Sequence, residues 1–162
     1  MFEWAWKRAV AGRPGALTRV FWAWIPFNKP HRFAIVELAE GRAVVAAPSR
    51  RWNRNHLGTQ HACSLATVGE FAAGLSLLGA FSPDAYRMIM SRLEVDYTRR
   101  AEGRVEAHAE VAAELLVAFR EELASTGLAR VVVESVLRDG AGEQVALVKT
   151  HWQVKSWTQI AS

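Results

Sequence analysis

The longest apolar stretch of the chain is Asn55–Pro83, in which Glu70 is the only Asp, Glu, Lys or Arg. Its segment His61–Phe81 contains no proline and predicts one long helix with Thr59 as the N-cap. Large apolar residues occupy the remaining sides, so we expect the helix to be enclosed and Glu70 to lie among apolar neighbours. One side of this helix carries only small residues, which allow another layer to approach closely: Ala62, Ala66, Gly69, Ala73, Ser76 and Ala80.

Patterns typical of β-strands flank this helix on both sides. Before it, two Val- and Ala-rich runs joined by Gly41 predict a hairpin. After it, two segments alternate apolar and polar residues with the period of a strand, and we expect Ile89, Leu93, Val95 and Tyr97 on one face of the first. A helical pattern that ends at Gly127 and a second hairpin complete the chain. The predicted elements are strands at Phe33–Ala39, Arg42–Ala47, Met88–Thr98, Gly103–Ala112, Ala129–Arg138 and Gln144–Trp157, and a helix at Ala113–Ser125.

This order of elements predicts an α+β fold, with a curved antiparallel sheet of five or six strands wrapped round one long central helix. We assign residues 1–30 to an aromatic N-terminal helical segment and residues 31–162 to a single domain. A curved sheet covers such a helix on one side only. We therefore expect a second subunit to cover the other side in a homodimer or a homotetramer.

Composition narrows the classes of partner. The chain has 162 residues and a formal charge of +4, and its arginines are spread over small clusters, which favours a small anionic ligand over a nucleic acid. The single cysteine, Cys63, excludes an intramolecular disulfide and fits a cytoplasmic location, and we expect its thiol to be packed. A membrane span over residues 62–81 is disfavoured by its small residues and central acid, and membrane contact through the N-terminal tryptophans is a minor alternative.

Two interpretations of Glu70 follow from the residues alone. The carboxylate is either a structural group, bonded to a backbone amide or an arginine, or a functional acid with a perturbed pKa. His56 and His61 are too few for a metal site, so we expect no metal.

The segment around the start of the helix resembles a known motif. Asn55, Gly58 and His61, followed by Glu70, match the Asn-x-x-Gly-x-x-His-Gly-Gly segment of hotdog-fold acyl-CoA thioesterases, in which an acid lies nine residues after the histidine. The order of elements matches that fold as well. The resemblance is greatest to an uncharacterised branch related to the phenylacetate-degradation type of thioesterase. The chain departs from the pattern where Ala62 and Cys63 replace Gly-Gly, and in its added helix at Ala113–Ser125.

The resemblance implies hydrolysis of an acyl-CoA or a related acyl thioester. Glu70 would be the general base or the nucleophile, and Asn55 would orient the water or the thioester. The backbone amides of His61 and Ala62 would stabilise the oxyanion, and the His61 side chain is a further candidate for contact with the carbonyl. In relatives, the loop of one subunit and the acid of the other share a site.

The resemblance also implies how the substrate is held. Gly58, Thr59 and Ala62 would bind the substrate, and Arg99 and Arg100 would meet the coenzyme A phosphates. Coenzyme A enters only as part of the substrate, so no separate cofactor is expected, and an acyl carrier protein is the alternative thiol carrier. The acyl group would lie against Phe71, Leu77, Phe81 and N-terminal aromatic residues, a set that suits either an aryl group or a medium aliphatic chain. Two other functions stay open: non-catalytic binding of acyl-CoA or lipid, and hydration of an enoyl thioester by His61 with Glu70.

Overall fold

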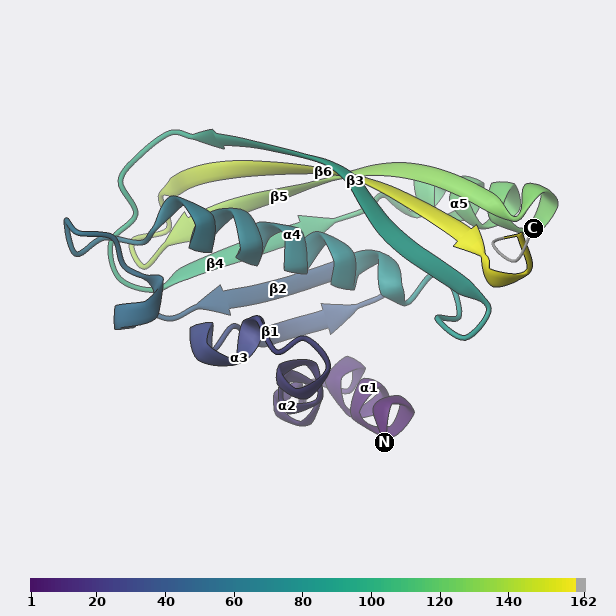
Figure 1. Ribbon diagram of the computed structural model, residues 1–162, viewed down its shortest axis with the longest axis horizontal. Helices are drawn as coiled ribbons and strands as arrows, with labels where there is room; N and C mark the ends of the chain where they lie inside the picture. Colours follow the sequence, from purple (N-terminus) through teal and green to yellow (C-terminus); the bar gives the residue numbers. More distant parts are fainter. Residues whose placement is uncertain (160–162) are drawn as a thin grey trace.

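One antiparallel sheet of six strands forms the body of the protein (Figure 1). The computed structural model describes residues 1–159, and residues 160–162, which we assigned to the main domain, lie outside the described residues. The strand order is β1-β2-β4-β5-β6-β3, so β1 and β3 are the edges. The strands are β1 (Ala34–Ala39), β2 (Arg42–Ala47), β3 (Tyr86–Tyr97), β4 (Val105–Glu110), β5 (Leu128–Asp139) and β6 (Gln144–Ser156).

The long helix α4 (Ala62–Leu78) lies against the inner face of this sheet, as the sequence predicts (Figure 1). The small residues of α4 do permit close contact. A Cβ atom added at Gly69 would lie 2.5 Å from Cγ2 of Val148 on β6. The Ser135 hydroxyl on β5 donates a hydrogen bond to the Gly69 carbonyl oxygen at 2.8 Å. Helix and sheet therefore meet at Gly69 so closely that a larger side chain has no space there.

The predicted ends of the central helix are wrong by a few residues. His61, not Thr59, is the N-cap, because its ring Nδ1 accepts a hydrogen bond from the Cys63 amide at 3.1 Å. The Thr59 hydroxyl is instead engaged by Asn55. At the other end the helix stops at Leu78, before Phe81.

A β-bulge in β3 overturns the predicted alternation of that strand. The pairing with β6 shifts between Met90 and Arg92, so Ser91 is the extra residue. Met90 pairs with the buried Trp152, which places the even-numbered side chains before the bulge on the face toward α4. Ile89 consequently points to the outer face, whereas the predicted parity put it with Leu93.

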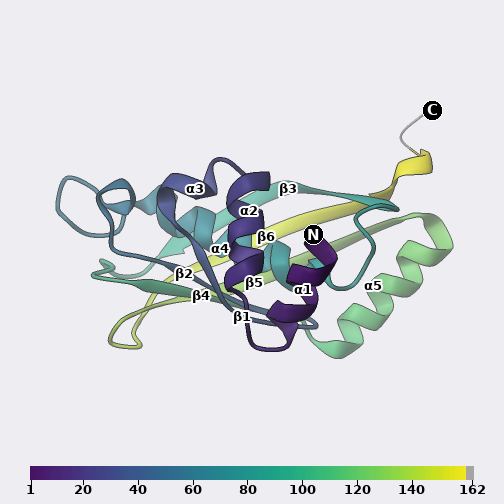
Figure 2. The same cartoon turned by 90° about the horizontal axis from the view of Figure 1, so that it is seen from below.

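Three N-terminal helices lie beside β1 and one side of α4: α1 (Phe2–Val10), α2 (Gly15–Trp24) and α3 (Asn28–His31) (Figure 2). The ring of Phe21 meets Phe71 of α4 edge to face at 5.3 Å between centroids. The Ile35 amide of β1 donates to the Thr18 hydroxyl at 3.0 Å. These helices thus lie over the domain itself and cover part of the α4 surface that a curved sheet leaves open.

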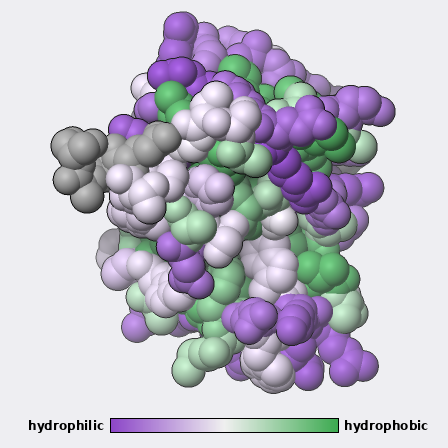
Figure 3. Space-filling view, turned by 90° about the vertical axis from the view of Figure 1, so that its right-hand side faces the viewer, coloured by the Kyte–Doolittle hydropathy of each residue, from purple (hydrophilic) through white to green (hydrophobic). Residues whose placement is uncertain are grey.

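The remaining long helix, α5 (Ala113–Thr126), lies at the end of the sheet near the end of α4. Its buried residues Leu116, Phe119 and Leu123 face the core, and Arg120 donates to the Ala80 carbonyl oxygen at 3.2 Å. On this end of the molecule apolar residues are interspersed with hydrophilic ones (Figure 3).

Within residues 1–159, none of the helices has both the length and the apolar composition needed to cross a membrane.

Candidate functional site

Glu70 lies at a cavity of about 240 Å³ between α4, α2 and the inner face of the sheet. It is the only charged residue among the residues that line this cavity. The others are apolar or glycine: Phe21, Ile25, Phe71, Gly74, Leu75, Leu78, Met88 and Trp152. The cavity therefore offers an apolar group a place directly beside one carboxyl group.

Burial among these residues changes the acidity of Glu70. Desolvation raises the pKa of its carboxyl group from 4.5 to about 7. No hydrogen bond or ion pair to the Glu70 side chain is found within residues 1–159. The structural interpretation, which needed a backbone amide or an arginine as partner, is thus not supported. A carboxyl group with a pKa near 7 exchanges its proton readily at neutral pH.

The residues around Glu70 differ in part from those predicted. Phe71 lines the cavity and so does Phe21 from the aromatic N-terminal segment. Leu77 is fully buried away from the cavity. Phe81 packs against Phe119 of α5 at 6.3 Å between ring centroids. The cavity lies on the side of α4 that carries Gly74. Helix periodicity gives the angular position of each residue on α4, but it does not tell on which side of Glu70 the sheet leaves space.

Among the lining residues that the sequence did not predict, Met88 and Trp152 come from the sheet. Both lie on strands far from Glu70 in the sequence. Their position depends on the pairing of β3 with β6, in which Met88 faces Val154 and Met90 faces Trp152. The sequence signal for Trp152 was the alternation of β6, which predicts the buried face of the strand. It does not predict which residue of α4 a strand residue contacts.

The start of α4 has two backbone amides without an acceptor in the described part of the chain, those of Ala62 and Ser64. Of the two backbone amides predicted to stabilise the oxyanion, that of His61 is already engaged, because it donates to the Asn53 carbonyl oxygen at 2.7 Å. The His61 ring caps the Cys63 amide through Nδ1, so its other nitrogen, Nε2, carries the proton of the neutral ring. The Cys63 side chain is exposed, which contradicts the expected packed thiol.

Asn55 organises the loop before α4. Its side-chain oxygen accepts from the amides of Leu57 at 2.9 Å and Thr59 at 3.2 Å, and its amide group donates to the Thr59 hydroxyl at 3.0 Å. Gly58 lies at the tip with φ of 78°, a conformation that favours glycine. The loop is therefore held in shape by Asn55, and Asn55 does not line the cavity at Glu70.

Arg99 and Arg100 follow β3 at the same end of the molecule as the start of α4. The Gln60 backbone amide donates a hydrogen bond to the Ala101 carbonyl oxygen at 3.0 Å, which joins the two segments. Each arginine has a carboxylate partner, Glu143 for Arg99 at 2.6 Å and Glu102 for Arg100 at 2.8 Å. Binding of a phosphate by either residue would therefore compete with an existing ion pair.

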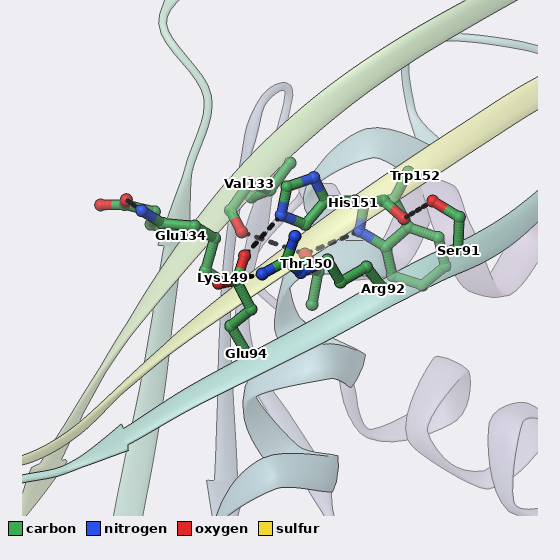
Figure 4. A network of polar contacts seen from close by, with 9 residues as sticks. All are labelled: Ser91, Arg92, Glu94, Val133, Glu134, Lys149, Thr150, His151 and Trp152. Atoms are coloured by element: carbon green, nitrogen blue, oxygen red, sulfur yellow. Dashed lines mark hydrogen bonds and ion pairs between the residues drawn. The ribbon is translucent and has the colours of Figure 1, made fainter.

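A second group of ionisable residues lies on the outer face of the sheet, away from α4 (Figure 4). His151 Nε2 lies 2.8 Å from Glu94 Oε1, and Arg92 pairs with the same carboxylate at 2.9 Å. The hydrogen bond with His151, more than the charge of Arg92, lowers the pKa of Glu94. Because His151 alternates with the buried Trp152, this cluster and Glu70 are on opposite faces of the sheet.

The sequence over residues 14–154 matches the model of a protein family described as a domain of unknown function, DUF4442. The chain belongs to the DUF4442 family. None of the curated proteins matches this DUF4442 chain in sequence.

Solved structures show what this DUF4442 protein is similar to. A Pseudomonas aeruginosa protein described as of unknown function and a probable thioesterase has a TM-score of 0.78 and 26% identity, over 86% of this chain and 94% of that one. A mutant of the phenylacetic acid degradation protein PaaI from Thermus thermophilus has a TM-score of 0.60 and 24% identity, over 80% and 98% of the two chains. A Staphylococcus aureus thioesterase mutant has a TM-score of 0.67 and 14% identity, over 80% and 98%. These matches confirm the predicted α+β hotdog fold and the predicted resemblance to the hotdog thioesterase superfamily.

Proposed function

We propose that this protein hydrolyses an acyl thioester, with Glu70 as the general base for water or as the nucleophile. The observation that carries the proposal is a carboxyl group, unpartnered within residues 1–159, beside an apolar cavity of about 240 Å³, with its pKa raised to about 7 by burial. An apolar acyl group would occupy the cavity, which places its thioester carbon at the carboxyl group. Both roles require the carboxylate form, so turnover should rise with pH through about 7.

The developing oxyanion requires hydrogen-bond donors within about 3 Å of it. The amides of Ala62 and Ser64 suit this task chemically, because they lie at the positive end of α4. However, Ala62 and Ser64 precede Glu70 by eight and six residues, and at 1.5 Å per residue they lie about 12 Å and about 9 Å from it along the helix. These separations favour a site in which the amides and Glu70 come from different chains, so we infer that a second subunit supplies the amides.

The sheet offers a suitable edge for that second subunit. β3 is an edge strand of twelve residues, and its Ile89, Leu93 and Tyr97 side chains are 44%, 38% and 48% exposed. Long edge strands with exposed apolar side chains favour pairing with another chain. A homodimer formed along β3 is therefore our proposal for the assembly, in which Asn55 of one subunit orients a substrate bound at Glu70 of the other.

Thiol release from a panel of acyl-CoA thioesters tests the proposal. The wild type and Glu70→Gln, which keeps the shape but cannot act as a base, are compared with Glu94→Gln, which alters a carboxylate on the outer face. We expect turnover in the wild type and in Glu94→Gln, and a loss of at least about a hundredfold in Glu70→Gln. Undiminished turnover in Glu70→Gln would refute the assignment. Tight binding of acyl-CoA with no turnover in any protein would instead indicate the non-catalytic binding function.

A mixing experiment tests the shared site. Glu70→Gln and Asn55→Ala are each expected to be inactive, but a co-expressed mixture contains heterodimers in which one site has both residues intact. Partial recovery of turnover in the mixture is the expected result. A mixture as inactive as its components would contradict a site shared between subunits.

A further inference from the structure

A second cavity, of about 300 Å³, lies along the same side of α4 as Glu70, toward the start of the helix. Cys63 and Thr67 line it, and Glu70 and Gly74 continue the same side at helical spacing in the first cavity. Thr67 precedes Glu70 by three residues, about 4.5 Å along the helix. The two cavities therefore adjoin one continuous side of α4, with Glu70 near their boundary.

The walls of this second cavity are mainly aromatic. His31 stacks on Phe33 at 5.3 Å between ring centroids, with an interplanar angle of 12°, and Phe27 packs on His31 at 5.0 Å. Trp52 lines the cavity and is 71% exposed, and Phe27 is 60% exposed. Aromatic side chains that are so exposed beside a cavity are suited to stacking on a flat ligand.

Asn53 holds these walls in place. It is fully buried, and its side-chain amide donates to the carbonyl oxygens of His31 at 2.9 Å and Pro48 at 2.8 Å. Its side-chain oxygen therefore accepts from His31 Nδ1 at 2.8 Å. Its carbonyl oxygen accepts from the His61 amide at 2.7 Å. One residue thus ties α3, the short helical turn η1 (Arg51–Asn53) and the start of α4 together, so the cavity exists before any ligand binds.

Three arginines that flank Trp52 in the sequence differ from Arg99 and Arg100 near the start of α4. Arg50, Arg51 and Arg54 are exposed, and none of them meets a carboxylate within residues 1–159. Arg99 and Arg100, in contrast, are paired. The segment from Arg50 to Arg54 thus carries unpaired guanidinium groups and an exposed indole, the two chemical features that recognise a purine nucleotide.

We propose that this cavity binds the adenine nucleotide of coenzyme A, with Trp52 stacked on the base and Arg50, Arg51 and Arg54 on the phosphates. The assignment rests on the proposed thioesterase function, and it makes coenzyme A rather than a carrier protein the thiol carrier. The pantetheine arm then runs past Thr67 to a thioester at Glu70. The acyl group points the opposite way, into the cavity formed with α2.

The test compares two substrates and one fragment in the wild type, in two single tryptophan variants and in one double arginine variant. The substrates carry the same acyl group on coenzyme A and on pantetheine, which lacks the nucleotide. The fragment is adenosine 3′,5′-bisphosphate, whose binding is measured by calorimetry and needs no turnover. Trp52→Ala is matched with Trp4→Ala, since Trp4 is similarly exposed at 58% but lies on α1 outside the cavity.

In Trp52→Ala we expect the KM for acyl-CoA and the Kd of the fragment to rise at least about fivefold, as loss of base stacking predicts. Its kcat and its kinetics on acyl-pantetheine should match those of the wild type, and Trp4→Ala should match the wild type in every measurement. Replacing Arg50 and Arg51 together by serine should weaken fragment binding and reduce its dependence on salt.

Two results would overturn the proposal. The first is equal loss on acyl-CoA and acyl-pantetheine in Trp52→Ala, which indicates a general disturbance of the site. The second is no binding of the fragment to the wild type. A failure of the proposed thioesterase function would look different from these two results. The wild type would then turn over neither acyl-CoA nor acyl-pantetheine, while the fragment would still bind and its binding would still depend on Trp52.

Discussion

Replacing Glu70 by glutamine should stabilise the protein at alkaline pH while it abolishes turnover. The folded protein holds the Glu70 proton up to a pKa of about 7, whereas the unfolded chain releases it near 4.5. Between these values the folded state binds more protons, so the free energy of unfolding of the wild type falls as pH rises. Below about 4.5 the group is protonated in both states and contributes nothing. Above about 7 the loss is complete.

The magnitude follows from the same two values. Each pH unit in this interval lowers the free energy of unfolding by about 1.4 kcal/mol. The interval between 4.5 and about 7 therefore corresponds to about 3 kcal/mol. Solvent that reaches the partly exposed side chain reduces this, and we expect about 2–3 kcal/mol at pH 8. Glutamine has a similar shape and no charge, so Glu70→Gln escapes this pH-dependent loss.

Urea denaturation of the wild type and Glu70→Gln from pH 4.5 to pH 9 measures the effect. The difference in unfolding free energy between the two proteins should grow in favour of the variant between about pH 4.5 and pH 7 and then stay constant. In thermal unfolding at pH 8 the variant should melt several degrees above the wild type, since about 1 kcal/mol moves Tm by about 2–4 °C in a chain of this size. A difference that does not change with pH would refute the reasoning, because it would mean that Glu70 is not buried in its neutral form.

Three further outcomes follow from the contacts of single residues. Glu94→Gln removes a carboxylate whose pKa is lowered by its hydrogen bond with His151; this contact adds stability above the ordinary carboxyl pKa and loses it as pH falls below, so the variant should be less stable at neutral pH and match the wild type in acid denaturation. Gly69→Ala places a methyl group within 2.5 Å of Val148, and we expect a loss of about 1–3 kcal/mol in urea denaturation; a neutral effect would show that α4 can move off the sheet. Gly74→Ala meets its nearest neighbours at 3.4 Å, an ordinary contact, so it should fold normally but lower kcat/KM selectively for the largest acyl groups of a thioester panel; an equal loss for all chain lengths would contradict the placement of the acyl group.

The fold class and the buried position of Glu70 could be predicted from local patterns along the chain. Gly41, Gly127 and the turn of the second hairpin, between Arg138 and Gln144, mark the ends of elements by local backbone chemistry, and the absence of charge around Glu70 marks a buried helix. Such signals act between residues a few positions apart, so they can be recognised in one dimension. These signals were sufficient to predict the order of the main strands and helices along the chain. They also predicted that Glu70 lies among apolar residues, and the motif from Asn55 to Glu70 added the resemblance to thioesterases.

The surroundings of Glu70, in contrast, depend on contacts between segments that are far apart in the chain. The Ser91 bulge reversed the faces of β3 and brought Met88 to the cavity, and α2 placed Phe21 there from near the start of the chain. Other contacts of this kind engage groups that we had assigned to the substrate: the His61 amide donates to Asn53, and Arg99 pairs with Glu143. Strand register and the competition between hydrogen-bond partners depend on which distant segments meet, and neither periodicity nor spacing along the sequence contains that information.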